Sequence, residues 1–392
     1  MKKSTLLFVT ILISFFPSGD LFAKGKVKVD KALEQAARQY LYMRSELQGS
    51  NQFPKTYDKN MQRLKTSNSE WWCSGFYPGT LFYLYEDTGN KELYAEGVRM
   101  LKLLEPEQYN VNTHDVGFMM YCSYGNANRV APKPEYKDIM VNSARSLISR
   151  FSPVVGCIKS HNRKPDDYVV IIDNMMNLEL LMFASKAFDN DTLEYVARTH
   201  ANTTLKNHFR KDYSSYHLVD YDPEDGHVRS RQTVQGYSNE SSWGRGQAWA
   251  LYGYTMMFRM TRDEKYLEHA ENIADMLLSR LPVDGIPYWD FDAPNGNEYR
   301  DASAGAIMAS AFVELSGFAT DEKARQNYLS IAEKQLRTLA SSHYLAEPGT
   351  NCNFILKHSV GNLPEKSEVD VPLSYADYYF LEALLRYKKA MG

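Results

Sequence analysis

The sequence predicts an all-α fold, an (α/α)6 barrel in which six helical hairpins close into a ring. Two observations lead to this prediction. Helix pairs recur along the chain at a spacing of roughly 50–60 residues, close to the length of known helical repeats. The first helix of each pair is apolar or small nearly all round, whereas the second carries charge on one face. The first should therefore lie inside and the second outside. The inner helices begin with polar and aromatic groups, which favours a closed ring over the alternative, an open helical solenoid.

The helix pairs can be followed in order along the chain. The predicted pairs are Leu81–Glu86 with Lys91–Leu104, Met175–Phe188 with Thr192–Asn207, Trp249–Met260 with Glu264–Leu278, and Ala304–Phe318 with Glu322–Leu339. The turns Asp87–Asn90 and Thr261–Asp263 carry residues that cap the second helix of their pairs. The other predicted helices are Val29–Leu47, a segment after Asp115, a segment from Glu135, and Ser374–Lys389, which gives roughly twelve in all. Strand signals are few.

Composition and charge exclude several classes of protein. The chain has 392 residues, with 45 Lys and Arg against 48 Asp and Glu, and a formal charge of −3. Because this balance gives no broad basic surface, nucleic acid is not an expected partner. Aromatic residues make up 13% of the chain, which suits either a large helical core or a surface that stacks on sugars.

The first residues have the pattern of a secretory signal peptide. Lys2 and Lys3 precede the apolar run Leu6–Phe16, and Ala23 marks a small-residue exit. We therefore expect residues 1–23 to be removed, residues 24–392 to form a single barrel domain, and the protein to be exported to the periplasm. No later stretch is long and apolar enough for a membrane helix, so no membrane insertion is expected.

Four cysteines remain after the signal peptide, at positions 73, 122, 157 and 352. Export would allow two disulfides. Free thiols that pack as small apolar groups are the favoured interpretation, because a chain of this length can bury its own core.

The loops that open the inner helices share Trp, Gly, Asp and other polar residues. These loops are Trp71–Phe76, Thr113–Phe118, Ile171–Asn177, Ser241–Trp249 and Arg300–Ala304. In a barrel of parallel inner helices, these starts meet at one mouth, and helix N-termini favour negative charge. The sequence therefore predicts a concave site for an anionic sugar.

Three carboxylates occupy equivalent places in these loops. Asp173 follows the apolar run Val169–Ile172, so it is either a helix N-cap or a carboxyl group with a perturbed pKa. Asp115 has the same two interpretations, and the pair together indicates acid–base catalysis. Asp301 occupies the same slot in a loop that looks exposed, and we expect it to cap its helix.

Arg245 lies between two glycines, which let a ligand or the backbone approach closely. Its guanidinium could bind a carboxylate with two hydrogen bonds, or pair with a neighbouring Asp.

The chain shows no zinc, P-loop, dinucleotide or serine-hydrolase motif, so neither a metal nor a cofactor is expected. Asp220–Gly226 departs from a calcium loop and is interpreted as a plain turn.

At these same loops the chain resembles glycoside hydrolase family 88, the unsaturated glucuronyl hydrolases, from about Trp71 to Arg386. The matching blocks are Trp72–Gly79, His114–Phe118, Asp173–Asn177, Gln235–Tyr237, Ser242–Trp249, Pro287–Asp292 and Asp370–Phe380. The resemblance implies an (α/α)6 barrel that removes a 4,5-unsaturated glucuronic acid from the non-reducing end of lyase-made, glycosaminoglycan-type oligosaccharides. It also implies that the step is hydration of the vinyl ether double bond.

The resemblance further implies roles for individual residues. Asp173 would protonate C4 of the double bond and then take a proton from the water that adds at C5, with Asp115 as the second essential carboxyl group. The residues that match substrate-binding positions or blocks are Trp72, His114, His217, Gln235, Arg245, Trp249 and Lys357.

The chain departs from the family at three places. His161 stands where a Trp is frequent, and Val234 stands before Gln235 where many members have His. Cys352–Lys357 keeps only the Lys of a Ser-x-x-Ser-x-Lys stretch found in members that accept sulfated substrates. Two alternative functions stay open at this point. One is an unsaturated rhamnogalacturonyl hydrolase acting on pectin fragments, and the other is a non-catalytic periplasmic glycan-binding protein.

Overall fold

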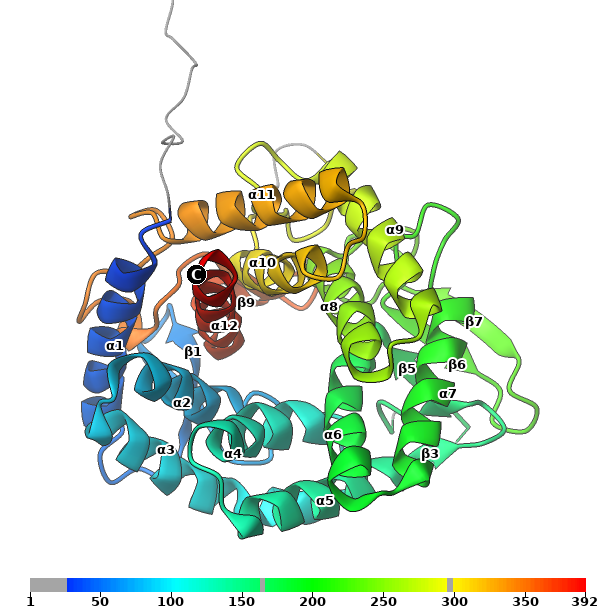
Figure 1. Cartoon of the computed structure of the whole chain (residues 1–392), viewed down its shortest axis with the longest axis horizontal. Coiled ribbons are helices and arrows are strands. Elements are labelled where there is room, and N and C mark those ends of the chain that lie inside the picture. The colour runs from blue at the N-terminus through cyan, green and yellow to red at the C-terminus, as the bar shows by residue number, and fades with distance from the viewer. Residues whose placement is uncertain (1–26, 163–165, 295–298) are drawn as a thin grey trace, which may run out of the picture.

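The computed structural model describes residues 27–162, 166–294 and 299–392 of the chain. The predicted signal peptide, residues 1–23, lies outside this part. Figure 1 shows the helices in two concentric rings. The outer ring consists of α1 (Val29–Glu46), α3 (Lys91–Leu104), α5 (Pro134–Ile148), α7 (Asp191–Asn207), α9 (Glu264–Arg280) and α11 (Glu322–Leu339). The inner ring consists of α2 (Phe76–Thr88), the π-helix η2 (Gly117–Gly125) with α4 (Asn126–Val130), α6 (Leu178–Phe188), α8 (Gly244–Thr261), α10 (Ala302–Ser316) and α12 (Ser374–Met391). Outer and inner elements alternate along the chain, which confirms the predicted (α/α)6 barrel.

Burial explains why each helix lies in its ring. Every residue of α8 from Gly244 to Phe258 is buried, so this helix contacts protein on all sides. The outer helix α3 instead buries one face, which includes Leu93, Met100 and Leu104. A helix that is apolar all round must lie inside, whereas one with a single apolar stripe covers it from outside.

Capping residues set the starts of the outer helices as the sequence predicts. The Asn90 side chain accepts hydrogen bonds from the backbone N–H groups of Glu92 and Leu93 at the start of α3. Asp263 accepts one from the N–H of Lys265 at the start of α9. Each cap satisfies N–H groups that have no partner within the helix.

Short antiparallel strands decorate the helix connections. The pairings are β1 (Phe53–Asp58) with β2 (Arg63–Ser67), β3 (Phe151–Ser152) with β4 (Cys157–Ile158), β5 (Tyr168–Ile171) with β6 (Leu218–Tyr221) and β7 (Val228–Gln232), and β8 (Ser359–Asn362) with β9 (Ser367–Val371). The sequence analysis found few strand signals, because strands of two to six residues are too short for a clear period. The central strand β6 pairs Leu218 with Ile171 of β5, two residues before Asp173.

Two glycines let neighbouring inner elements touch through their backbones. A Cβ atom on Gly117 would lie 2.4 Å from Cα of Asn177, and one on Gly75 would lie 2.2 Å from the carbonyl oxygen of Met119. Neither distance is possible for a real side chain. The starts of α2 and η2 and the short 3-10 helix η3 (Ile172–Asn177) are therefore held in direct contact.

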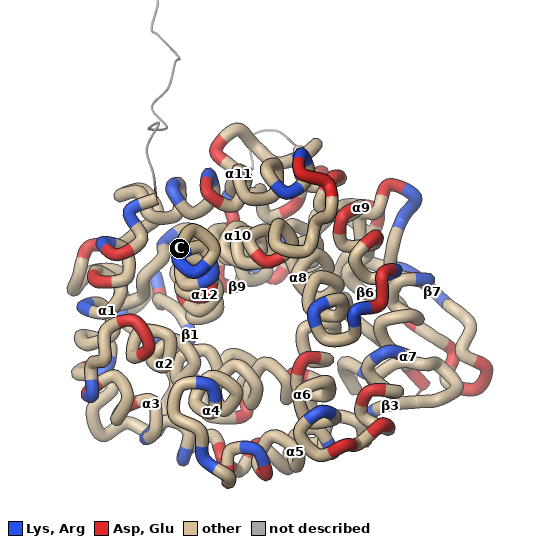
Figure 2. The backbone as a smooth tube through the Cα atoms, in the orientation of Figure 1, with Lys and Arg blue, Asp and Glu red and all other residues tan. Residues whose placement is uncertain are grey.

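The distribution of charge agrees with the near-neutral balance of acidic and basic residues in the sequence. Figure 2 shows Lys and Arg interspersed with Asp and Glu around the ring. All four cysteines are free, as predicted, and three of them are buried. Among the described residues, no helix has both the length and the apolar character needed to cross a bilayer.

Candidate active site

The predicted site residues gather where the inner helices begin. Asp115 lies just before η2, Asp173 lies in η3, and Arg245 lies in the first turn of α8. The hydrogen bond from the N–H of Phe118 to Oδ1 of Asn177, 2.9 Å long, fixes the start of η2 against the end of η3. The sequence therefore folds locally so that separate inner helices present their first residues to one shared space.

Asp173 is held in a setting that favours its neutral form. Burial raises the pKa of this carboxyl group to about 7. The positive charge of Arg245 and the Trp249 side chain lower this pKa, and the negative charge of Asp115 raises it. Its Oδ2 atom is buried and has no hydrogen-bond partner among the described residues. The N-cap interpretation of Asp173 is wrong, because Ile171 occupies the N-cap of η3 and no side chain caps that helix.

His217 faces Asp173 with a defined tautomer. Its Nε2 atom lies 3.8 Å from Oδ2 of Asp173, while its Nδ1 atom accepts a hydrogen bond of 3.3 Å from the backbone N–H of Gln235. Because Nδ1 accepts, the neutral ring carries its proton on Nε2. His217 therefore turns an N–H toward the carboxyl group.

The Arg245 guanidinium is buried and bound by protein acceptors. It donates to Oδ2 of Asp301 at 3.4 Å, to Oε1 of Gln235 at 2.9 Å, to the carbonyl oxygen of Gly361 at 2.7 Å, and to the carbonyl oxygen of Val360. The pairing with a neighbouring Asp, one of its two predicted roles, is therefore present. Its Nε atom is buried with no acceptor among the described residues, so one donor is left for a ligand.

Asp301 both caps α10 and pairs with Arg245. Its side chain accepts from the N–H of Ser303 at the start of α10, which confirms the predicted cap. The expectation of an exposed loop is wrong, because Asp301 is fully buried. Pairing with Arg245 explains how a carboxylate can remain there.

Asp115 is the second carboxyl group with a raised pKa. Burial raises this pKa to about 6, against the lowering effects of His161, Thr113 and Arg150. The Thr113 hydroxyl donates to Oδ2 of Asp115 at 3.0 Å. The negative charge of Asp115 in turn helps to raise the pKa of Asp173, which shows that the two carboxyl groups interact.

His114 contacts Asp115 and bonds the asparagine that follows Asp173 in the chain. Its Nδ1 atom lies 3.0 Å from Oδ1 of Asn174, and its Nε2 atom lies 3.5 Å from Oδ1 of Asp115. The amide nitrogen of Asn174 donates to the carbonyl oxygen of Ile158 at 2.8 Å, so Oδ1 must accept and Nδ1 of His114 must donate. Burial lowers the pKa of His114 to about 3, so the ring is neutral at physiological pH.

Aromatic rings form the wall beside these groups. The Trp72 ring lies 5.5 Å from Phe118 and 4.9 Å from Tyr375. Phe118 lies 5.2 Å from Trp249, which is fully buried. Trp72 is partly exposed and can stack on a sugar, whereas Trp249 is fully buried and offers no open ring face.

Lys357 is placed differently from the other predicted residues. Its Nζ atom donates to the carbonyl oxygen of Ser342 at 2.8 Å. No contact within the described ranges joins Lys357 to either carboxyl group. A substrate role for this residue stays a prediction.

Sequence reasoning assigned no role to three residues that complete the site. Asn174 orients His114, and its signal was its place directly after Asp173. The guanidinium of Arg245 lies 5.4 Å from the Tyr375 ring, whose buried hydroxyl has no hydrogen-bond partner among the described residues. The His161 ring, at the position where the family often has a Trp, lies edge-on to His114 at 5.2 Å.

The described residues contain one acidic cluster with metal-ligand spacing, away from this site. It consists of Asp222, Asp225 and His227. His227 bonds Asp225 at 2.6 Å, and Arg229 pairs with Asp222 at 2.6 Å. The two carboxylates of the cluster are thus paired with nearby side chains, as expected for a plain turn.

Comparison with known proteins gives a consistent family. A model of Glycosyl Hydrolase Family 88 matches residues 47–366. An unsaturated glucuronyl hydrolase from Formosa agariphila is 40% identical over 400 residues, which cover 98% of each chain. The crystal structure of an unsaturated glucuronyl hydrolase specific for heparin matches with a TM-score of 0.88 and 47% identity, over 92% of this chain and 97% of that one.

A third match includes a ligand. A variant of the unsaturated glucuronyl hydrolase from Streptococcus agalactiae, solved with dGlcA-GalNAc6S, has a TM-score of 0.79 and 26% identity over 95% of this chain and 94% of that one. These matches support the glucuronyl hydrolase interpretation and neither of the two alternatives. The chain is a glycosidase and belongs to Glycosyl Hydrolase Family 88.

Proposed function

We propose that this chain removes a 4,5-unsaturated glucuronic acid from the non-reducing end of glycosaminoglycan-derived oligosaccharides by hydrating the double bond. The observation that carries this proposal is the buried Asp173 carboxyl group, with a pKa of about 7 and an Oδ2 atom that has no hydrogen-bond partner in the described part of the chain. Such a group holds a proton at neutral pH and can also take one back, which is what a single acid–base catalyst requires.

The residues around Asp173 fit the two proton transfers. In the first step Asp173 gives its proton to C4 of the vinyl ether, and positive charge develops at C5 and the ring oxygen. The resulting carboxylate then takes a proton from a water molecule as the water oxygen bonds to C5. The hemiketal formed in this way opens and releases the remaining sugar. The N–H of His217, at 3.8 Å, is placed to stabilise the Asp173 carboxylate between the two steps.

The recognition of an anionic sugar has a physical basis in the same space. Arg245 brings a permanent positive charge to the site, and its Nε donor finds no acceptor among the residues that the structure describes. Trp72 offers an accessible ring for the adjoining sugar. We therefore assign the uronate carboxylate to the side of Arg245 and the next sugar to the side of Trp72.

The substrate class follows from the relatives. Disaccharides made by heparin lyases are the first choice, because the 47% identical structure is that of an enzyme specific for heparin. Chondroitin disaccharides are the second choice, because a less similar relative was solved with dGlcA-GalNAc6S.

The experiment is a direct assay of the double bond. Purified protein is mixed with unsaturated disaccharides from heparin or chondroitin lyases, and the ultraviolet absorbance of the conjugated bond is followed. Absorbance should fall with wild-type protein and stay constant with Asp173→Asn. Wild-type protein that leaves every unsaturated uronic disaccharide intact would contradict the proposal.

We also propose that the protein works outside the cytoplasm. Support comes from the sequence pattern of residues 1–23, where two lysines precede a short apolar run that ends at Ala23. Cell fractionation should find the shortened chain in the periplasm. Full-length protein in the cytoplasm would exclude export.

A further inference from the structure

A groove on the outside of the barrel follows the C-terminal end of α5. It joins two open hollows, of about 400 Å³ and about 240 Å³, that share Val111. The last turns of α5 line the smaller hollow with Arg145, and the chain after that helix lines the larger one with Arg150 and Lys159. The two hollows together are called the α5 groove below. Val111 precedes Asp115 by four residues, so the groove begins in the loop that leads to this carboxyl group.

Every charged residue that lines the α5 groove is basic. These residues are Arg145, Arg150 and Lys159, and no Asp or Glu of the described ranges lines either hollow. Within the same ranges none of the three forms an ion pair with a carboxylate. Arg145 and Arg150 instead donate to uncharged oxygen atoms. The groove therefore holds three positive charges that no direct ion pair neutralises.

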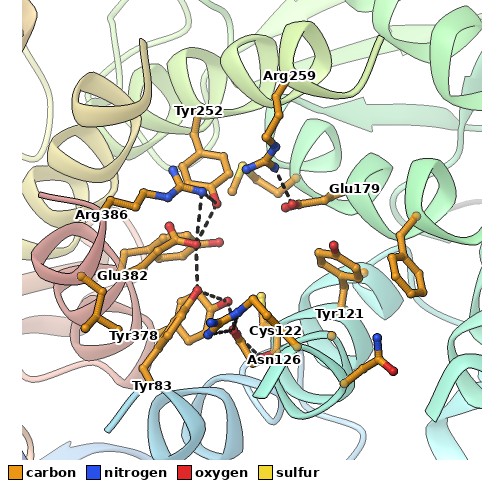
Figure 3. A pocket seen from close by; sticks show the side chains of 18 of the residues that line it. Tyr83, Tyr121, Cys122, Asn126, Glu179, Tyr252, Arg259, Tyr378, Glu382 and Arg386 are labelled. Carbon is orange, nitrogen blue, oxygen red and sulfur yellow. Dashed lines mark hydrogen bonds and ion pairs between the residues drawn. The ribbon is translucent and has the colours of Figure 1, made fainter. Parts of the chain in front are cut away.

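The arginines of the cavity within the barrel differ in this respect. Arg259 pairs with Glu179 there, as Figure 3 shows. Arg386 pairs with Glu382 at 3.4 Å. Those arginines already have a carboxylate of the protein as counterion, whereas the described residues supply none for the α5 groove. An anionic ligand is therefore expected in the groove.

Arg150 is held in place by neutral acceptors. Its Nε atom donates to the carbonyl oxygen of Lys159 at 2.8 Å, and its Nη1 atom donates to that of Val111 at 2.7 Å. Carbonyl oxygens orient a guanidinium without neutralising its charge. The pKa of Arg150 agrees, because burial lowers it and the nearby Tyr168 and Asp115 offset that effect only in part. An anion that enters the groove thus meets a positive charge that is already fixed, which lowers the entropic cost of binding.

Exposed apolar surface lies beside these charges. Tyr109 is 67% exposed and Val111 is 47% exposed, and both line the smaller hollow together with Arg145. An exposed tyrosine ring can stack on the C–H face of a sugar, and an arginine can bind an oxyanion with two hydrogen bonds. An open ring next to basic side chains suits a chain of acidic sugars better than a small inorganic anion.

We infer that the α5 groove binds an acidic polysaccharide chain, whose sulfate or carboxylate groups contact Arg145, Arg150 and Lys159 while a sugar ring lies on Tyr109. The choice of ligand rests on the proposed function, because such polymers are the source of the unsaturated oligosaccharides. A polymer bound there would hold the enzyme where lyases release its substrate.

The test uses isothermal titration calorimetry with saturated sugar chains of equal length, which lack the double bond and are not substrates of the proposed reaction. The probes are decasaccharides of heparin and of unsulfated heparosan, and the neutral maltodecaose. Heparin should bind most tightly, heparosan more weakly, and maltodecaose not measurably. The affinity for heparin should fall at least about tenfold between about 50 and about 200 mM salt, because three ion contacts release counterions. No binding of heparin, equal binding of maltodecaose, or equal binding of a DNA duplex of the same charge would overturn the inference.

Variants locate the bound chain. Arg145→Gln combined with Lys159→Gln should weaken heparin binding at least about tenfold, because two charged hydrogen bonds are lost. The control combines Arg325→Gln with Lys323→Gln on α11, which lies across the ring from α5 in Figure 1, and should change binding less than about twofold. Tyr109→Ala should weaken binding several-fold. Equal losses in the two double variants, or unchanged binding in the first, would overturn the inference.

Two further variants separate the groove from the catalytic mouth. Trp72→Ala and Asp173→Asn should bind the heparin decasaccharide as wild type does. Loss of heparin binding in Trp72→Ala would place the chain in the mouth and overturn the inference. A protein that binds heparin through Arg145 and Lys159 but hydrates no unsaturated disaccharide would contradict the proposed function alone.

Discussion

Nδ1 of His114 lies 3.0 Å from Oδ1 of Asn174, and this hydrogen bond joins the two turns that carry Asp115 and Asp173. The asparagine cannot rotate its amide, because its nitrogen is held by the carbonyl oxygen of Ile158. The His114 ring is therefore fixed in one tautomer and one orientation beside Asp115. The Asn174 amide thus determines which nitrogen of His114 faces Asp115.

Replacing Asn174 should damage both stability and turnover. In Asn174→Leu, the buried Nδ1–H of His114 loses its acceptor, which costs about 1–3 kcal/mol of unfolding free energy. Urea unfolding measures this loss, and kcat should fall because His114 no longer keeps its place. Asn142→Leu is a matched control. Asn142 lies on the outer helix α5, and its amide donates a hydrogen bond to the Gln108 side chain instead of to a site residue. Equal stability and kcat in both variants would show that His114 is held by other contacts.

Asp173→Asn should abolish most of the activity while the substrate still binds. General acid–base catalysis contributes about 10²–10⁴-fold, so kcat should fall at least that far. Steady-state kinetics on an unsaturated disaccharide measures the change. Asp138→Asn, at an exposed position of α5, should retain wild-type kcat. A folded Asp173→Asn enzyme with near wild-type kcat would remove Asp173 from the mechanism.

The alkaline limb of the pH–rate profile should respond to Asp115. Asp173 must be protonated to act, so kcat should decline as the pH rises past its pKa of about 7. The charge of Asp115 raises this pKa. In Asp115→Asn the limb should therefore move to lower pH, which residual activity or carbon NMR of the Asp173 carboxyl can follow. A limb that stays in place or moves upward would contradict the assignment.

Stability should also depend on the protonation of Asp173. Its pKa is about 7 in the folded protein against an ordinary value of 3.8, so the folded protein binds this proton more tightly than the unfolded chain. Ionisation therefore removes stability as the pH rises from about 4 to about 7, by on the order of 2–4 kcal/mol. Asp173→Asn should be more stable than wild type at pH 8 but not at pH 4, as urea unfolding can show. A stabilisation of the same size at both pH values would point to packing instead.

Arg245→Lys should lower both kcat/KM and stability. A lysine cannot reach the acceptors that the planar guanidinium satisfies, so Asp301 would lose its buried partner, at a cost of about 3–5 kcal/mol. Arg198→Lys, in a pair on α7 whose side chains are 31% and 33% exposed, should lose less than about 1 kcal/mol. Chemical denaturation of both variants tests this difference. A stable Arg245→Lys protein with low kcat/KM would mean that Arg245 acts mainly on the substrate.

The helices could be predicted from the sequence because their signals are local. The predicted ranges 91–104 and 322–339 match α3 and α11, which have one charged face and begin at the capping residues Asn90 and Asp321. The short strands could not be predicted, because β5 and β6 become strands only by pairing with each other across the fold. The same holds within the site. The burial of Asp301 depends on Arg245, 56 residues earlier, and no pattern around Asp301 reports that distant guanidinium.

The contact at Gly117 has a consequence for how this site can change. With Cα of Asn177 only 2.4 Å from where a Cβ would stand, any other residue at position 117 must push apart the turns that hold Asp115 and Asp173. The loops that carry β6 and β7, and β8 and β9, lie outside this contact. Engineering toward bulkier or differently sulfated sugars should therefore begin in those loops. The spacing of Asp115 and Asp173 depends on position 117 having no side chain, so it cannot be widened there without moving both turns.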